Sequence, residues 1–153
     1  MREIILQLAA AFFGSMGFAL MFNINKKYLL FASLNGVLCW GIYLIVQKQT
    51  GNIFLSSFAA TMAVTIVSEI QARIVKCPST PFYISGLIPL IPGSSLYYMI
   101  SGIAAGDRAA FSLYGRNLIW TLLGIAAAFG CLISTIHLLR NIREKQESSE
   151  RKA

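Results

Sequence analysis

A short apolar segment, SGLIPLIPGSSLYYMISG (residues 85–102), contains the residues whose types and spacing suggest chemistry most directly. Proline has no N–H, so Pro89 and Pro92 are each expected to leave the carbonyl four residues earlier without its helical donor. These carbonyls belong to Ser85 and Ile88. Gly93 then permits a backbone turn that other residues resist. The pattern predicts two short helices that meet end to end at Pro89–Gly93.

The residues after the turn predict a binding surface for a small charged solute. Ser94 or Ser95 can cap the second helix, whose positive dipole end would face an anionic group, while unpaired carbonyls would accept from a cation or a hydroxyl. We therefore expect a carboxylate at the amides near Gly93, Ser94 and Ser95, and an ammonium group at the carbonyls of Ser85 and Ile88. Tyr97 or Tyr98, in the first helical turn, would hydrogen-bond the solute. The alternative is a plain proline kink that neighbouring side chains repair, with no ligand.

The composition places this segment in a lipid bilayer. The chain has 153 residues, of which 56% are hydrophobic and 12% charged, whereas soluble domains carry about 25% charged residues. Five apolar runs are each about long enough to cross a hydrocarbon core of about 30 Å, namely residues 4–22, 28–46, 53–70, 82–106 and 118–139. The predicted fold is an all-α integral membrane protein, a bundle of five transmembrane helices with the fourth broken at Pro89–Gly93. Backbone groups at such a break must be buried in protein or line a wet cavity.

The 13 Lys and Arg residues indicate the orientation of the bundle. Five spans would put nine of them on one side and four on the other. The nine are Lys26, Lys27, Arg73, Lys76, Arg140, Arg143, Lys145, Arg151 and Lys152, and the four are Arg2, Lys48, Arg108 and Arg116. We therefore expect the N-terminus outside, residues 1–140 as the bundle, and residues 141–153 as a charged cytoplasmic tail. Topology thus explains the net charge of +7 better than nucleic-acid binding does.

Few other polar residues stand out. Glu69 and Arg73 have i,i+4 spacing and share a helix face. They form either an interfacial ion pair or a group that couples protons or binds an ammonium, because acidic residues in or near spans are usually functional. His137, close to the same interface, is most simply a headgroup-level residue.

Catalytic and cofactor motifs are missing from the sequence. There is no H-E-x-x-H, no P-loop and no G-x-S-x-G, and the three cysteines form no C-x-x-C. We therefore expect no enzyme, no cofactor and no metal. A broken span is a recurring device of secondary transporters, so we expect transport by alternating access around the fourth span. Without a nucleotide motif, the proton gradient is the expected driving force.

The segment PLIPGSSLYYMISGIAAGD resembles the signature of the small, membrane-only half of the threonine/serine exporter family, which also includes two-subunit dicarboxylate (succinate-type) exporters. GFALMFNINKK and SEIQARIVKCPSTPF agree in order, and the resemblance extends roughly from Gly14 to Leu139. It implies a subunit that exports small polar metabolites together with a larger membrane subunit, in a bacterial cell (inner) membrane. The matched positions, to which it assigns no individual roles, include Asn23, Glu69, Arg73, Pro89, Pro92, Gly93 and Tyr97 or Tyr98. The alternative function is a non-transporting membrane scaffold that stabilises a partner.

Overall fold

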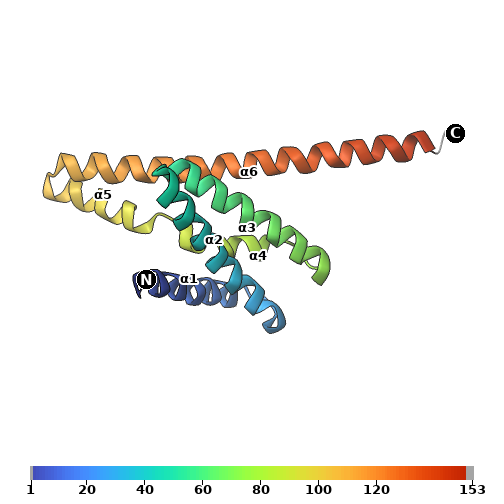
Figure 1. Cartoon of the computed structure of the whole chain (residues 1–153), viewed down its shortest axis with the longest axis horizontal. Helices are drawn as coiled ribbons and strands as arrows, with labels where there is room; N and C mark the ends of the chain where they lie inside the picture. The colour runs from blue at the N-terminus through green and yellow to red at the C-terminus, as the bar shows by residue number, and fades with distance from the viewer. Residues whose placement is uncertain (1, 151–153) are drawn as a thin grey trace.

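The computed structural model describes residues 2–150, although not the side chains of residue 133 and residues 135–150, among them His137. Every regular element in this part of the chain is a helix (Figure 1). The α-helices are α1 (Arg2–Met21), α2 (Leu29–Thr50), α3 (Ile53–Val75), α4 (Thr80–Leu87), α5 (Gly93–Ala105) and α6 (Arg108–Glu150). Two 3₁₀ turns, η1 (Lys26–Tyr28) and η2 (Ile88–Leu90), precede α2 and follow α4.

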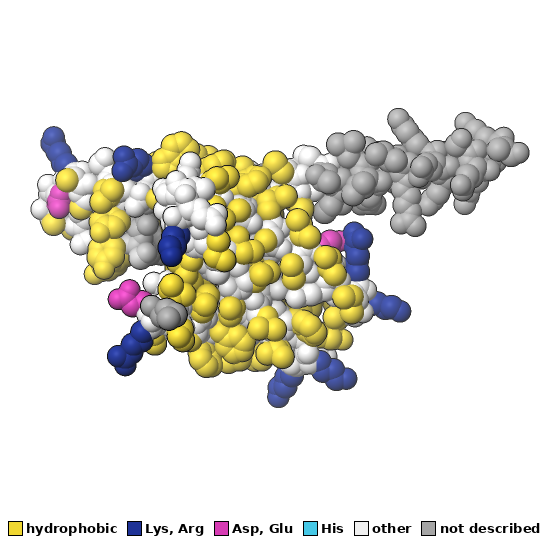
Figure 2. Space-filling view, in the orientation of Figure 1, with side chains coloured by type: hydrophobic (Ala, Val, Ile, Leu, Met, Phe, Trp, Pro, Cys, Tyr) yellow, Lys and Arg dark blue, Asp and Glu magenta, His cyan; other side chains and the backbone are white. Residues whose placement is uncertain are grey.

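The helices are long and apolar enough to form a multi-pass membrane bundle. Four of them qualify as single spans, and α4–η2 with α5 forms a fifth that is bent by 46° at the break. Figure 2 shows hydrophobic side chains over most of the visible body, with Lys and Arg side chains mostly at its periphery. The predicted all-α membrane bundle, with its fourth span broken, is therefore confirmed.

The last helix begins ten residues before the apolar run that predicted it. The chain turns at Gly106, with φ +69°, and the carboxylate of Asp107 accepts from the amides of Ala109 and Ala110, both at 3.0 Å. These bonds cap α6 at Arg108. Hydropathy locates the apolar part of a helix and misses a polar first turn that is stabilised by its cap.

The ends of the helices come together in two groups. A cluster of Ala19, Ala32 and Phe82, with Val75 packed on it, joins the ends of α1 and α3 to the starts of α2 and α4. The basic residues near these ends therefore lie at the same end of the bundle, namely Lys26, Lys27, Arg73 and Lys76. At the other end, Gly51 turns the chain with φ +63° and Asn52 caps α3. Arg116 of α6 lies beside this turn, because the two line one cavity.

Glycines bring the helix backbones close together. A Cβ on Gly86 of α4 would lie 2.8 Å from the Asn35 Cβ of α2, and one on Gly124 of α6 would lie 2.6 Å from the Phe54 carbonyl oxygen of α3. Gly102 packs in the same way against the first turn of α6. Such close approach is a main source of helix association where lipid gives no hydrophobic drive.

A buried amide pair ties α2 to α3. The Asn35 side-chain amide donates to Gln71 at 2.9 Å and to Ser68 at 3.1 Å, and the Gln71 amide donates back to Asn35 at 3.0 Å. Because Gly86 presses against Asn35, this polar pair also fixes the position of α4, the first half of the broken span.

Candidate functional site

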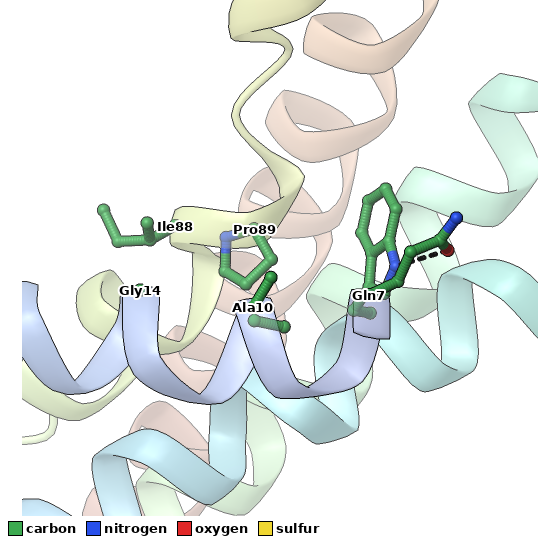
Figure 3. Close-up of a pocket in the computed structure, with 7 residues that line it drawn as sticks. Gln7, Ala10, Gly14, Ile88 and Pro89 are labelled. Atoms are coloured by element: carbon green, nitrogen blue, oxygen red, sulfur yellow. Dashed lines mark hydrogen bonds between the residues drawn. The ribbon is translucent and has the colours of Figure 1, made fainter. Parts of the chain in front are cut away.

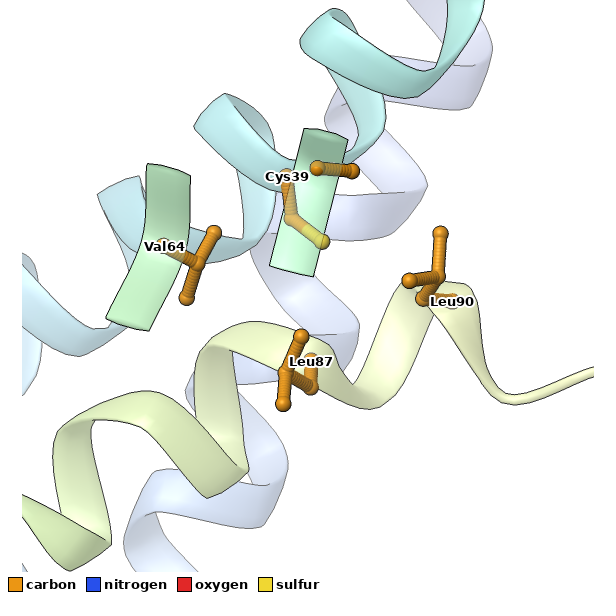
Figure 4. Packing of buried hydrophobic residues seen from close by; sticks show 5 residues of the cluster. Cys39, Val64, Leu87 and Leu90 are labelled. Carbon is orange, nitrogen blue, oxygen red and sulfur yellow. The ribbon is translucent and has the colours of Figure 1, made fainter. Parts of the chain in front are cut away.

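The broken span is held on one side by apolar packing. Leu87, which precedes the 3₁₀ turn, and Leu90, its last residue, pack with Cys39 of α2 and Val64 of α3 in a buried cluster (Figure 4). Their exposed fractions are 8% and 3%. This side of the break is thus closed by side chains of α2 and α3, and any solute site must lie on the other sides.

The carbonyls expected to be unpaired both have donors. Ser85 accepts from the amide of Ile88, and Ile88 accepts from the amide of Ile91 at 3.1 Å. The chain tightens into a 3₁₀ turn, whose i→i+3 bonds use donors one residue earlier and so bypass both prolines. The Ser85 hydroxyl is fully buried and donates to the Pro81 carbonyl at 2.7 Å. The prediction that these two carbonyls lack a donor is therefore wrong, and their binding of an ammonium group stays a prediction.

The second half of the span begins with unpaired amides. Pro92 has φ −78° and ψ +54°, and the amide of Gly93 donates to the Ile91 carbonyl at 2.7 Å, as in an inverse γ-turn. The helix α5 then begins at Gly93 without a side-chain cap, so Ser94 and Ser95 are not its cap. Within residues 2–150, the N–H of neither serine donates to a backbone carbonyl. Their amides carry the positive end of the α5 dipole.

These two serines line a cavity of about 120 Å³, which we call the break cavity. Its walls also include Pro89, Pro92, Trp40, Tyr43, Leu90, Ile91 and Thr121. A water molecule takes about 30 Å³ in the liquid, so the cavity can hold a small metabolite, whereas drug-sized ligands need about 300 Å³ or more. None of the described residues that line it is charged. A carboxylate there would be held by amide dipoles.

Two aromatic rings form one wall of the break cavity. Trp40 and Tyr43 stack with their centroids 5.0 Å apart and their planes 15° apart. Ring faces of this kind attract a cation, so they are a further candidate place for an ammonium group. Sequence reasoning missed these two residues and Thr121, because they lie on α2 and α6, far along the chain from the proline segment.

The other predicted residues lie away from this cavity. Tyr97 and Tyr98 are exposed, and Tyr98 stacks on Tyr114 of α6 at 5.0 Å, so their substrate role stays a prediction. Asn23 ends α1 with φ +54°. The lining of the break cavity includes none of these three residues.

Glu69 and Arg73 form the expected ion pair. Their charged atoms are 3.6 Å apart, and the side chains are 36% and 77% exposed. An exposed pair of this kind contributes at most about 1 kcal/mol. Any role in coupling stays a prediction. Among the residues that the structure describes, no three His, Cys, Asp or Glu side chains gather in a way that would hold a metal ion.

Comparison with known families decides the class of protein. The family described as "Threonine/Serine exporter, ThrE" matches residues 7–136, from α1 through the apolar part of α6. The chain belongs to the threonine/serine exporter family. The match includes the whole broken span and every wall of the break cavity, so these features lie in the exporter domain. No solved structure matches the chain.

Proposed function

We propose that this exporter-family chain is a subunit of a secondary transporter for small polar metabolites, either threonine/serine-type amino acids or small dicarboxylates. The observation that carries the proposal is the break cavity, a small uncharged space lined by Ser94 and Ser95, the residues of the first turn of α5 whose amides have no backbone acceptor. A half-helix N-terminus at a broken span is a recurring way to hold an anionic substrate in secondary transporters. Family membership supports export as the direction of transport.

The two halves of the broken span pack on different partners, which supports alternating access. Leu87 and Leu90 hold α4–η2 to α2 and α3, whereas α5 packs along α6. The residues between the halves, Ile91 and Pro92, are partly exposed or exposed. A change in the 46° bend would therefore alter the break cavity while both packed faces are kept. Because α6 also packs on α3 through Gly124, the proposed transport step is movement of α5 and the first part of α6 against α4–η2.

The α5–α6 hairpin supports a role for a larger membrane subunit. Because Arg116 lies beside the α2–α3 turn, the eight residue steps from Arg116 back to Arg108 extend about 12 Å beyond that level at 1.5 Å per residue. Figure 1 shows the hairpin running past the turn. Tyr97 and Ile103 on α5 are 68% and 61% exposed. Lipid that covered this apolar surface would also contact the charged residues Asp107 and Arg108 in the turn between α5 and α6. A partner protein therefore suits the surface better than lipid does.

Export measurements test the proposal. Cells that express this chain, the larger subunit or both would be preloaded with radiolabelled threonine, serine or succinate. Export is expected only with both, and only while the proton gradient is intact. Glu69→Gln should then respond less to that gradient than the control Glu3→Gln, since Glu69 is the proposed coupling group. If the proton gradient stimulates export equally in both variants, Glu69 is not the coupling group.

Straightening the broken span should stop export. Pro92→Ala/Gly93→Leu favours continuous helix through the break and fills the space near the serines, so export is expected to fall at least about tenfold, as for the loss of about 1.4 kcal/mol of binding. The control is Gly17→Leu, because a Cβ at this position would meet nothing within 4 Å. If the double variant exports as well as wild type while the chain is still required, this protein is a scaffold in a bacterial inner membrane complex.

A further inference from the structure

A second cavity lies on the α1 side of the break, with a volume of about 270 Å³ (Figure 3). We call it the α1 cavity. Its walls are Gln7, Ala10, Ala11 and Gly14 of α1, with Ile88, and it shares only Trp40 and Pro89 with the break cavity. Because Trp40 and Pro89 border both spaces, they are the candidates for a partition between them. Pro89 is fixed by the backbone of η2, whereas the indole of Trp40 can rotate about its side-chain bonds.

The indole is held in its position by one hydrogen bond. Trp40 Nε1–H donates to Gln7 Oε1 at 3.2 Å, across from α2 to α1 (Figure 3). On its other side the ring stacks on Tyr43. Because an indole N–H in apolar surroundings needs an acceptor, this bond favours the orientation that keeps the two cavities apart. The bond thus gives a structural role to Gln7, a polar residue in a mostly apolar helix.

We propose that Trp40 sets the upper size limit of the exported solute and that Gln7 holds the indole in the limiting position. This inference rests on the proposed transport function. Without the indole, the break cavity opens into the α1 cavity, whose α1 wall consists largely of Ala10, Ala11 and Gly14, with space beyond Gly14. The joined space is mainly apolar and suits a bulky apolar side chain, while the amides of Ser94 and Ser95 still receive the carboxylate.

A labelling experiment tests the partition without any need for transport. Thr121 is 7% exposed and lies in the α6 wall of the break cavity, so Thr121→Cys reports access to that space. The reporter is placed in a Cys77→Ser/Cys131→Ser background, which keeps the buried Cys39, and the background alone is the blank. The purified protein is treated with a maleimide too large for the break cavity. Trp40→Ala should raise its labelling rate at least about tenfold, a change worth about 1.4 kcal/mol.

Two milder variants keep this test decisive if Trp40→Ala fails to fold. Gln7→Leu changes an exposed residue of α1, and Trp40→Phe keeps a ring without its N–H. Both lose the bond to the indole and should raise labelling to similar, intermediate rates. Labelling rates equal to that of the parent in every folded variant would overturn the proposal.

An export panel then tests the size limit. In cells with both subunits, wild type should export threonine and exclude phenylalanine, and Trp40→Ala should raise the phenylalanine-to-threonine ratio at least about tenfold. An unchanged ratio overturns the size limit even if labelling rises. If the wild-type protein exports no small solute, the transport function itself fails, together with the size limit, and the labelling result still decides whether Trp40 divides the cavities.

Discussion

Replacing Gly124 with valine is expected to destabilise the bundle by about 3 kcal/mol, near the upper part of the usual range for overpacking. A Cβ at this position would lie 2.6 Å from the Phe54 carbonyl oxygen and 2.9 Å from the Ser57 Cβ. Because one of these neighbours is backbone, relief requires α3 and α6 to move apart, and their contact is among the most extensive in the bundle.

The matched control is Gly130→Val, six residues later in the same helix. A Cβ at Gly130 meets nothing within 4 Å, so this change has the same chemistry and helix propensity without the steric conflict. The free energy of unfolding, measured by denaturant titration in detergent micelles, should separate the two variants clearly. Equal stabilities would mean that α3 and α6 do not pack through Gly124.

Removing one amide at the start of α5 should weaken solute binding on the order of 10- to 100-fold. Ser94→Pro deletes the N–H of Ser94, while proline remains acceptable in the first turn of a helix. A hydrogen bond to a charged group contributes about 1.5–3 kcal/mol, and each 1.4 kcal/mol is about a tenfold change in affinity. The loss is expected because no charged side chain among the described residues lines the break cavity to compensate.

Ser94→Ala is the control for this change. It removes the hydroxyl but keeps the amide, so its affinity for threonine or succinate should stay within about threefold of wild type, or well under 1 kcal/mol. The measurement is equilibrium binding of the radiolabelled solute to the purified two-subunit complex. If Ser94→Ala weakens binding as strongly as Ser94→Pro, the hydroxyl holds the solute, and the dipole account of the site is wrong.

The sequence predicted the spans and the place of the break, because both depend on local chemistry. Apolar runs of membrane length define helices wherever they pack, and Pro89, Pro92 and Gly93 interrupt a helix in any context. The Glu69–Arg73 pair was predictable for the same reason, since i,i+4 spacing alone places the charges together.

The walls of the site were not predictable, because they depend on how the helices pack. Nothing local to Trp40, Tyr43 or Thr121 relates them to a proline segment on another helix, and the contact depends on the close helix approach that Gly86 and Gly124 allow. Whether the carbonyls of Ser85 and Ile88 would have hydrogen-bond donors was also not predictable from the sequence. A proline can leave a carbonyl unpaired or shift the chain into a 3₁₀ turn, and here the packing of Leu87 and Leu90 accompanies the turn.

Photolabelling locates the bound solute most directly. A small photoreactive carboxylic acid would be added to the purified two-subunit complex, and the labelled residues would be mapped by mass spectrometry with and without excess threonine or succinate. The account predicts labelling at Trp40, Tyr43 and residues 92–95 that the competing solute suppresses. Suppressible labelling confined to the partner subunit, with none around the break in this chain, would contradict it.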